Sequence, residues 1–489
     1  MTIQELIEFI NPLDTSKYQS DTMVGPLVQD SRQVTDGSVF IAIRGHEVDG
    51  HAFMEDAIYR GAKVVICEES FYSDEDVCII EVENTRSLIG PLAHKMAGNP
   101  ANQLKVVGIT GTNGKTTTAT LVYQILMECG YKASLLGTVA KKILDETIDS
   151  KLTTSDPIEL ASDMRAMVDA GSQYLVMEVS SHALHQERVN GFSFDIGVFT
   201  NLSQDHLDYH NNIEEYAAAK KLLFDRLPAD GTAIVNVDDA YGKRMIAQCD
   251  AQLIKFSFEE EENAILSNTA EGLKLKVHGQ ELSSSLSGNF NAYNIAQAYL
   301  VCEALGLDSA VIADAFTKVD GAPGRMENVT LEAGKDKLPT VIVDYAHTPD
   351  ALENVLNTLK SLKEGTDQKL ICVFGAGGDR DTSKRPKMAQ AAEQFADLVI
   401  VTSDNPRTEN PDVIIADILQ GFESTENVSS ITSRDEAINH AIQTANASDI
   451  VLIAGKGHEN YQEINGERHH FDDREVAREA LTAKLGGLN

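Results

Sequence analysis

Apolar residues along the chain recur in two patterns that alternate with each other. Short continuous runs rich in Val, Ile and Leu indicate buried strands, at 39–43, 64–66, 106–110, 174–179, 196–200, 233–236, 341–344, 370–374, 398–402 and 450–454. Several of these runs are followed by segments whose apolar residues recur every three or four positions, which indicates helices. Alternating strands and helices are typical of a parallel sheet with helices on both faces. We therefore expect an α/β protein.

Polar turns divide this series into three parts. The first part ends at Gly98-Asn99-Pro100, and a polar stretch at 333–339 precedes the third. A chain of 489 residues is long enough for several domains. The pattern predicts a small N-terminal α/β domain over 1–100, a central P-loop parallel-sheet domain over 101–335 and a C-terminal Rossmann-like α/β domain over 336–489.

The strand at 106–110 leads into a glycine-containing turn and then into an apolar helical pattern. The turn consists of Gly111, Thr112, Asn113, Gly114, Lys115, Thr116 and Thr117. Such a turn directs backbone N–H groups at phosphate oxygens, while the lysine adds a charge and the following hydroxyl can bind Mg²⁺. The longer Walker pattern has glycine where this chain has Ile109, so the match is to the shorter form. An ordinary turn rich in small residues is the alternative, and the Lys-Thr pair directly after the second glycine argues against it.

The charge balance restricts the partners. The 75 acidic and 41 basic residues give a net charge of −34, which disfavours nucleic acids and anionic membranes. Six cysteines lie far apart without paired spacing, as expected for thiols in a reducing compartment. The N-terminus has no basic segment before an apolar one, and no apolar run is long enough to cross a membrane. We therefore expect a cytoplasmic protein that binds no nucleic acid and does not insert into membranes.

Two strand ends carry candidate metal ligands. Glu178 ends the run at 174–179, where a carboxylate beside a phosphate loop could hold Mg²⁺, although a capping role is the alternative. His206 follows the run at 196–200 and is a candidate metal or phosphate ligand, although a lone histidine is more often structural.

Lys220 lies within the apolar stripe of a helix that starts at 213, whereas Lys221 points to a different side. Burial would lower its pKa and leave a neutral amine that can capture carbon dioxide as a carbamate, a further magnesium ligand. The alternative is that the ammonium snorkels to the surface. The pattern alone slightly favours snorkelling.

Further polar clusters stand near predicted helix starts and strand ends. Asn291 and Asn294 suit either a nucleobase or helix capping. Arg325 precedes the third domain, and Asp344 and His347 stand at the end of its first strand. The loop at 375–380, which contains Arg380, only half resembles a dinucleotide-binding turn. Loops at 404–407 and 455–459 follow strands of the same sheet and combine cations with acids, which suits an amino acid.

Taken together and in this order, these residues resemble the Mur ligase family of ATP-dependent amide-forming enzymes. The resemblance covers nearly the whole chain. It rests on the loop at 111–117, Glu178-Val179-Ser180-Ser181-His182, Asp205-His206, Ala219-Lys220, Asn291 with Asn294, and Asp344-Tyr345-Ala346-His347. Asp30-Ser31-Arg32 and Asp404-Asn405-Pro406-Arg407 resemble the branch that adds the third residue of the peptidoglycan stem peptide. The arginine form of the latter motif is typical of members that use meso-diaminopimelate, whereas lysine-adding members usually differ there.

The resemblance implies the site residues. The UDP-muramoyl dipeptide would be held by Ser31, His46, Thr153, Thr154, Ser180, Gln186 and Arg188. Diaminopimelate would be held by Arg380, Asp404, Asn405, Pro406, Arg407, Gly455 and Glu459. ATP would be held by the loop at 111–117 with Asn291, Asn294, Arg325, Asp344 and His347. Catalysis would use Lys115, Glu178, His206 and Lys220, and Mg²⁺ would be bound by Thr116, Glu178, His206 and Lys220. Leu152 departs from the family, which often has asparagine there, so no contact is assigned to it.

The implied reaction joins diaminopimelate to UDP-N-acetylmuramoyl-L-alanyl-D-glutamate through an acyl phosphate, in peptidoglycan synthesis and hence in cell shape and division. We expect a monomer with ATP and Mg²⁺ as cofactors. A lysine-adding relative and a folylpolyglutamate-synthase-like ligase are alternatives of the same class. A non-catalytic P-loop switch protein is the alternative of a different class.

Overall fold

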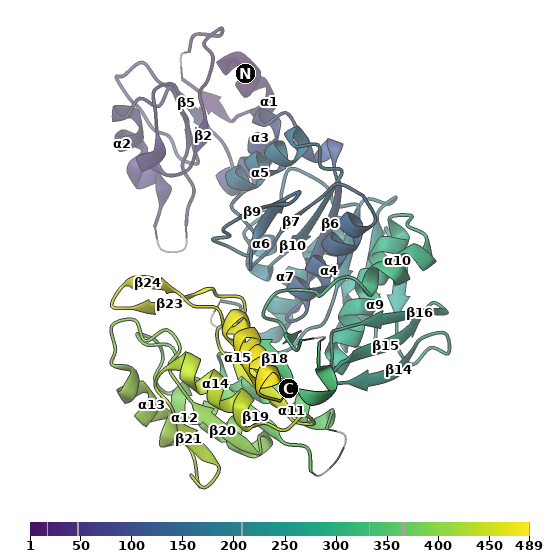
Figure 1. Ribbon diagram of the computed structural model, residues 1–489. Coiled ribbons are helices and arrows are strands. Elements are labelled where there is room, and N and C mark those ends of the chain that lie inside the picture. The colour runs from purple at the N-terminus through teal and green to yellow at the C-terminus, as the bar shows by residue number, and fades with distance from the viewer. Residues whose placement is uncertain are drawn as a thin grey trace. The chain divides into compact units, whose positions relative to one another are not determined.

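The structure is a computed structural model of the chain, and it describes residues 1–16, 18–45, 48–206, 209–331, 333–363, 365 and 367–488. The chain forms two compact units. The first unit comprises residues 1–115 and 130–256, and the second comprises residues 116–129 and 257–489 (Figure 1).

The N-terminal part of the first unit is a five-stranded sheet in the order β1-β5-β4-β3-β2, with only β1 antiparallel to its neighbour. Its elements are α1 (Ile3–Ile10), β1 (Asp14–Thr15), β2 (Leu27–Val28), η1 (Ser31–Gln33), β3 (Val39–Ile41), η2 (Gly50–Phe53), α2 (Met54–Tyr59), β4 (Val64–Cys67), β5 (Cys78–Glu81) and α3 (Thr85–Met96). Val64 and Ile66 face a core shared with α1 and α3, whereas Val65 faces a core shared with α2. Burial on both faces explains why these strands are continuous apolar runs in the sequence.

The second sheet of the first unit has eight strands in the order β13-β12-β11-β6-β10-β7-β8-β9. Its strands are β6 (Lys105–Thr110), β7 (Ala133–Leu136), β8 (Lys141–Ile143), β9 (Glu146–Ile148), β10 (Tyr174–Glu178), β11 (Ile196–Phe199), β12 (Thr232–Asn236) and β13 (Gln252–Phe256). The strands β6, β7 and β10–β13 are parallel, and β8 and β9 form an antiparallel edge. Because β6 lies between β10 and β11, the loops after these three strands meet at one edge of the sheet.

Helices pack against this eight-stranded sheet through one continuous apolar core. The segments in this region are η3 (Pro100–Gln103), α5 (Pro157–Asp169), α6 (Ser181–His185), α7 (Ile213–Asp225) and α8 (Gly242–Met245). Asp156 caps α5, since its carboxylate accepts the N–H groups of Ile158 and Glu159, and Pro157 occupies the first helical position.

The second unit contains the helix α4 (Lys115–Glu128) except for Lys115, which belongs to the first unit. It also contains a three-stranded antiparallel sheet and a six-stranded sheet. The elements before the six-stranded sheet are β14 (Ala264–Thr269), β15 (Gly272–Val277), β16 (Gln280–Ser284), α9 (Asn289–Ala304), α10 (Ser309–Phe316) and η4 (Lys335–Lys337). In β15 the buried residues Leu273, Leu275 and Val277 alternate with more exposed ones, so one face of this small sheet is apolar.

The six-stranded sheet has the order β17-β18-β22-β19-β20-β21, and only β17 is antiparallel. Its strands are β17 (Glu327–Asn328), β18 (Thr340–Asp344), β19 (Leu370–Phe374), β20 (Leu398–Val401), β21 (Val428–Ser430) and β22 (Ile450–Ala454). The helices are α11 (Pro349–Ser361), α12 (Lys384–Phe395), α13 (Pro411–Leu419), α14 (Arg434–Thr444) and α15 (Asp473–Leu488), and the hairpin β23 (Tyr461–Ile464) with β24 (Glu467–His470) precedes α15.

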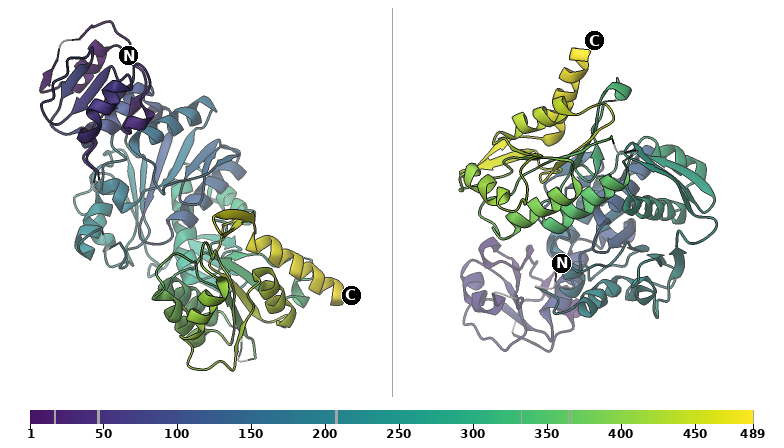
Figure 2. Two further views of the ribbon diagram at one scale, coloured as in Figure 1. Left: turned by 90° about the vertical axis from the view of Figure 1, so that its left-hand side faces the viewer. Right: turned by 90° about the horizontal axis from the view of Figure 1, so that it is seen from below.

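Alternate residues of these strands face two separate cores. Leu452 faces the core with α11–α13, whereas Val451 and Ile453 face the core with α14 and α15. Helices therefore cover both faces of this sheet, as predicted. The last helix, α15, lies beside α14 (Figure 2).

The predicted α/β class is confirmed, and the predicted strands are present with ends that differ by one or two residues. The hairpins β8–β9 and β23–β24 and the sheet β14–β16 are additional to those predictions. Strands β9 and β24 are exposed throughout, so they lack the apolar pattern that reveals a strand in the sequence.

Within the described residues, no helix is both long and apolar enough to cross a membrane. All six cysteines are free thiols.

Candidate active site

The turn after β6 is held in a defined shape by the segment after β11. Gly111 has a positive φ of 153°, and a Cβ at this position would lie 1.8 Å from Thr200 Oγ1. The N–H groups of Thr112 and Asn113 donate to the backbone and side-chain oxygens of Asn201, at 2.9 and 3.0 Å. The turn therefore needs glycine at its start, and hydrogen bonds to Asn201 hold its backbone in place.

Lys115, the first residue of α4, directs its ammonium back over this turn. Its Nζ donates to the carbonyl oxygens of Gly111 and Thr112, at 3.0 and 2.9 Å. Thr116 and Thr117 follow in the first turn of α4. A bound phosphate could replace the two carbonyl oxygens as the partner of Lys115 without moving the helix.

Glu178 ends β10 with a buried side chain. Thr138, which follows β7, donates to both carboxylate oxygens, through its N–H at 2.8 Å and its hydroxyl at 3.1 Å. The Thr138 hydroxyl also lies 3.0 Å from Thr153 Oγ1. Thr154 donates to the Glu178 carbonyl at 2.9 Å and accepts the N–H of Ser180 at 3.1 Å. The carboxylate therefore has a fixed position at the carboxyl end of the strand.

Arg188 extends this network from the segment after α6. Its Nη1 donates to the Thr154 carbonyl at 3.1 Å, and its Nε and Nη2 donate to Gln186 Oε1 at 3.0 and 2.7 Å. Burial lowers the pKa of Arg188. The structure thus brings into one hydrogen-bonded network Thr153, Thr154, Glu178, Ser180, Gln186 and Arg188.

Ser31 lies apart from this network. It is the buried first residue of η1, beside the N-terminal sheet, and its hydroxyl bonds to Asp56. Among the described residues, no hydrogen bond or ion pair joins Ser31 to that network. The other predicted ligand from this region, His46, lies outside the described residues.

Lys220 is buried on α7, with 1% of its surface exposed. Its Nζ donates to the Gly111 carbonyl at 2.7 Å and lies 4.3 Å from the centre of the Tyr216 ring. Burial, and secondarily the Lys115 charge, lowers the pKa of Lys220 well below its usual value. Lys221 instead pairs with Asp225 on the outer side of α7. The snorkelling alternative is therefore wrong, because the ammonium points inward to the phosphate turn.

His206 belongs to an aromatic cluster that sequence analysis missed. Its ring lies 4.9 Å from that of His182, and Tyr209 stacks on His182 at 4.1 Å. His210 is buried, lies 3.0 Å from Ser181 Oγ through Nε2, and has its pKa lowered to about 4, chiefly by burial. The repeated histidines of 182–185 and 206–210 were a signal in the sequence. Among the described residues, no three His, Cys, Asp or Glu side chains form a ready metal site.

In the second unit, Asn291 and Asn294 are buried in the first two turns of α9. Asn294 Nδ2 donates to Asn291 Oδ1 at 2.9 Å, and the Thr118 hydroxyl on α4 lies 3.4 Å from Asn294 Oδ1. Asn291 Nδ2 donates to the Ser287 carbonyl at 2.8 Å. These amides join α9 to the helix that begins at the phosphate turn.

Asp344, at the end of β18, is buried and accepts two backbone N–H groups, from Met326 at 2.7 Å and Ala346 at 2.8 Å. Burial raises its pKa, and the Arg325 charge opposes that shift. The Arg325 guanidinium lies over the Tyr345 ring at 4.8 Å. His347 is exposed beside Tyr345, at a ring distance of 4.6 Å. Arg325, Asp344 and His347 therefore form one group at this strand end.

The loops after β20 and β22 meet at the carboxyl edge of the six-stranded sheet. Gly455 has a φ of 120°, and a Cβ there would lie 2.5 Å from Asp404 Oδ2. Asn405 Nδ2 donates to Glu459 Oε2 at 2.8 Å. Both Asp404 and Asn405 are buried. Four residues predicted from two separate loops are thus in contact.

Arg380 and Arg407 both approach Gly377 in the loop after β19. A Cβ at Gly377 would lie 3.0 Å from Arg407 Nη1 and 3.9 Å from Arg380 Cγ. Arg407 has a positive φ of 50° and donates from Nη1 to the Gly378 carbonyl at 2.6 Å. Pro406 is buried just before it. Two cations and two acids therefore meet at this edge, which suits a ligand with several charges.

Two buried cations, to which sequence analysis assigned no role of their own, support these loops. Lys456 is fully buried, and its Nζ contacts Asn405 Oδ1 at 3.2 Å and Glu459 Oε2 at 3.5 Å. Arg434 pairs with Asp473, with both side chains fully buried, and donates to the carbonyl oxygen of Ser403 at 3.2 Å. Lys456 follows closely on the apolar run at 450–454, whereas Arg434 stands among polar residues and had no such signal.

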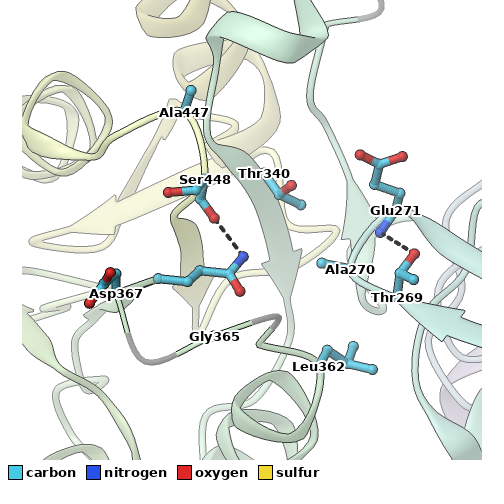
Figure 3. Close-up of a pocket in the computed structure, with 10 residues that line it drawn as sticks. Thr269, Ala270, Glu271, Thr340, Leu362, Gly365, Asp367, Ala447 and Ser448 are labelled. Carbon is cyan, nitrogen blue, oxygen red and sulfur yellow. Dashed lines mark hydrogen bonds between the residues drawn. The ribbon is translucent and has the colours of Figure 1, made fainter.

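The pocket in Figure 3 lies at the opposite edge of the same sheet. It has a volume of about 480 Å³ and is lined in part by Thr340 and Ser448, which precede or begin β18 and β22. No predicted site residue lines it. Ligands of parallel α/β sheets bind at the carboxyl ends of strands, so we place the candidate site at the other edge.

Comparison with known proteins identifies the family. Three family models match: "Mur ligase family, catalytic domain" over residues 27–97, "Mur ligase middle domain" over 109–302 and "Mur ligase, glutamate ligase domain" over 324–457. A Parabacteroides distasonis protein is 44% identical over 461 residues, which cover 93% of this chain and 94% of that protein. A Cytophaga hutchinsonii protein is 43% identical, with 98% and 99% covered. The chain belongs to the Mur ligase family.

Both relatives are named UDP-N-acetylmuramoyl-L-alanyl-D-glutamate–2,6-diaminopimelate ligase. A solved structure with the same name is 35% identical, covers 99% of both chains and has a TM-score of 0.74. The ADP complex of Mycobacterium tuberculosis folylpolyglutamate synthase, at 21% identity and a TM-score of 0.57, shares the fold. This Mur ligase family member is thus a ligase, and the non-catalytic alternative is wrong.

Proposed function

We propose that this chain is an ATP-dependent ligase that adds meso-diaminopimelate to UDP-N-acetylmuramoyl-L-alanyl-D-glutamate in peptidoglycan synthesis. The observation that carries the proposal is the contact of the loops at 404–407 and 455–459, which places Arg407 near the Asn405–Glu459 pair. Diaminopimelate has a carboxylate and an amine at each end. A guanidinium and a carboxylate held at one edge of the sheet match the distal pair. The names of the full-length relatives agree with this choice.

The remaining site residues divide among the other two substrates. For the UDP-muramoyl dipeptide we propose Ser31, His46, Thr153, Thr154, Ser180, Gln186 and Arg188. For ATP we propose the turn at 111–117 with Asn291, Asn294, Arg325, Asp344 and His347. For diaminopimelate we propose Arg380, Asp404, Asn405, Pro406, Arg407, Gly455 and Glu459. The network around Glu178 and the order of the phosphate turn support the first two assignments.

The reaction requires little covalent help from the protein. The terminal carboxylate of the dipeptide attacks the γ-phosphorus of ATP, the bond to the β-phosphate oxygen breaks, and ADP leaves. The amine of diaminopimelate then attacks the acyl carbon of the acyl phosphate, and inorganic phosphate leaves as the amine loses a proton. Lys115 neutralises phosphate charge, and the binding residues hold the reacting groups in line.

We also propose Mg²⁺ as a cofactor, held by Thr116, Glu178, His206 and a carboxylated Lys220. Hydroxyl and carboxylate oxygens suit this ion, and the fixed, buried carboxylate of Glu178 fits the requirement. When bound, Mg²⁺ would neutralise charge on the transferred phosphoryl group. A neutral, buried Lys220 amine can attack carbon dioxide, releasing one proton and forming a carbamate.

Three further expectations belong to this proposal. The domains span 1–100, 101–335 and 336–489 as UDP-substrate-binding, ATP-binding and amino-acid-binding domains, and the central domain also contributes most of the dipeptide ligands. The enzyme acts in the cytoplasm, where its nucleotide substrates are found, and it acts as a monomer. Two assignments compete with this proposal. A lysine-adding relative would use a different amino acid, and a folate-using ligase would use a different acceptor.

The proposal is tested by phosphate release in the presence of ATP, Mg²⁺ and the muramoyl dipeptide. Diaminopimelate, lysine and ornithine are compared as amino acids, and folate with glutamate replaces the dipeptide in a parallel assay. We expect phosphate release that depends on diaminopimelate and on the dipeptide. A preference for lysine, or turnover with folate, would refute the proposal.

A further inference from the structure

The hairpin β23–β24, labelled in Figure 1, is bound to the loop at 404–407 through several hydrogen bonds. The N–H of Arg407 donates to the Glu463 carbonyl at 3.0 Å, and the N–H of Asn465 donates to the Arg407 carbonyl at 2.7 Å. The N–H of Glu463 donates to Asn405 Oδ1 at 2.9 Å. Gln462 Nε2 donates to the Asp404 carbonyl at 2.7 Å. The backbone of Glu463 is therefore fixed relative to the proposed amino-acid residues.

The Glu463 side chain is directed at the Arg407 guanidinium. Its Oε2 lies 3.8 Å from Arg407 Nε, and the two side chains are 25% and 24% exposed. Nη1 of the same guanidinium donates to the Gly378 carbonyl. In the described part of the chain these are the polar contacts of the guanidinium, so Nη2 is left to bind a ligand.

Two neighbouring charged residues, Asp379 and Arg468, have other partners. Asp379 lies near Arg407, but its carboxylate accepts the N–H and hydroxyl of Thr408, at 3.1 and 2.7 Å. Arg468 is opposite Glu463 in the hairpin, but its guanidinium stacks on the Tyr461 ring at 4.2 Å. Within the described residues, Glu463 is the carboxylate that forms an ion pair with Arg407.

We propose that Glu463 determines how strongly the Arg407 site discriminates between amino acids with and without a distal carboxylate. The inference rests on the proposed function, in which Arg407 binds the distal carboxylate of diaminopimelate. Glu463 then acts as the resident counter-ion of Arg407, and it reduces the discrimination that Arg407 provides.

Two electrostatic effects lead to this conclusion. When an amino acid without a distal carboxylate binds, Glu463 keeps the guanidinium paired and so lowers the cost of burying it. When diaminopimelate binds, Glu463 is a second anion near the same cation and opposes the incoming carboxylate. Glu463 therefore favours lysine and disfavours diaminopimelate relative to a neutral residue at the same position.

The test compares Glu463→Gln with Glu467→Gln. Glu467 lies on the adjacent strand of the same hairpin and is exposed, so its substitution removes the same charge away from Arg407. The ratio of kcat/KM for diaminopimelate to kcat/KM for lysine is measured for both variants and for the wild type. We expect this ratio to rise about threefold or more in Glu463→Gln, as for a partly exposed ion pair. We expect no rise in Glu467→Gln.

The KM for ATP is the second readout, and we expect it to stay constant because a specificity residue acts on the amino acid alone. An unchanged or lower ratio in Glu463→Gln, with a wild type that prefers diaminopimelate, would overturn the role of Glu463 and leave the proposed function intact. An equal rise in both variants would overturn it too, since the effect would then be one of general charge. A wild type that prefers lysine would overturn both proposals.

Discussion

Lys220 is a buried cation that forms no ion pair with any described carboxylate. Its ammonium contacts a carbonyl oxygen and an aromatic ring, which compensate poorly for the loss of water. The lowered pKa follows from this environment and makes the neutral amine accessible. Lys221, the next residue, forms an ordinary ion pair on the outer side of the helix. The two residues thus provide a matched comparison of a buried and an exposed lysine.

We predict that Lys220→Ala lowers turnover by about 100-fold or more, because a charge-stabilising group at the reaction centre is lost. Added formate or acetate should restore part of the activity by supplying the missing carboxylate. Lys221→Ala should be nearly normal. Steady-state phosphate release measures all three. Equal losses at the two positions would contradict the role of Lys220, and an unmodified Lys220 in the active protein, analysed by mass under mild conditions, would exclude the carbamate.

Arg407 is the residue on which the choice of amino acid depends in the proposed function. Its backbone is bonded on both sides to the hairpin turn, and its guanidinium is held by Gly378 and Glu463. The backbone bonds and the Gly378 contact orient the guanidinium for a carboxylate, so less entropy is lost on binding, whereas the Glu463 charge opposes that carboxylate.

We predict that Arg407→Ala raises the KM for diaminopimelate by roughly 30-fold or more, since a charge-assisted bond to a partly buried cation contributes about 2 to 5 kcal/mol. The KM values for ATP and the dipeptide should change far less, and lysine use should not fall in parallel. Arg468→Ala, which removes an arginine stacked on Tyr461, is the control. A loss of ATP affinity in Arg407→Ala would show that Arg407 is not the specificity residue.

At the scale of elements, α3 shows how a buried polar group links local packing to pH. His94 on α3 is 1% exposed and stacks near Phe192, with ring centres 4.9 Å apart. Neither ring nitrogen has a hydrogen-bond partner in the described part of the chain. Burial lowers its pKa from 6.5 to about 4. The helix therefore packs well only while His94 is neutral.

The sign of the resulting pH dependence follows from proton binding. Between about pH 6.5 and pH 4 the unfolded chain takes up a proton at His94 that the folded protein does not bind. The free energy of unfolding therefore falls as the pH falls through this window. At about 1.4 kcal/mol per pH unit, His94 accounts for a loss of up to about 3 kcal/mol.

We predict that His94→Leu removes this loss, so that the variant gains stability over the wild type as the pH is lowered. Urea unfolding at about pH 7 and about pH 4.5 measures the difference. The exposed His440, changed to Leu, is the control. The same pH dependence in His94→Leu and the wild type would show that α3 tolerates a charged His94.

At the scale of the whole molecule, the net charge of −34 is the dominant electrostatic feature. Many like charges on one folded chain repel each other and oppose the compact state. The proposed substrates are anionic as well, so local cations such as Lys115, Arg188 and Arg407 must overcome this field. Salt at physiological strength screens charges over about 8 Å.

We predict that raising NaCl from about 20 to about 200 mM increases Tm by a few degrees, because screening reduces the self-repulsion more than it weakens the exposed ion pairs. Differential scanning calorimetry at pH 7 measures the shift, and KCl should act like NaCl. A constant or lower Tm would mean that the ion pairs outweigh the repulsion.

The sequence by itself determined the features that depend on short stretches of chain. The ten buried strands could be predicted because burial on both faces requires continuous apolar runs. The phosphate turn could be predicted because its geometry requires Gly111 and Lys115. Helical periodicity left two alternatives open for Lys220, and the inward direction was one of them. The remaining candidate site residues were predicted from the family resemblance.

The tertiary structure decided which of these residues meet. Asn405 and Glu459 are 54 positions apart, and their contact depends on the order of strands in the sheet, which local patterns do not encode. The burial of Lys456 and the pairing of Glu463 with Arg407 likewise arise from a hairpin whose strands, one partly buried and one exposed, have little apolar signal. Polar contacts between distant segments are set by packing geometry, so they are visible only once the chain is folded.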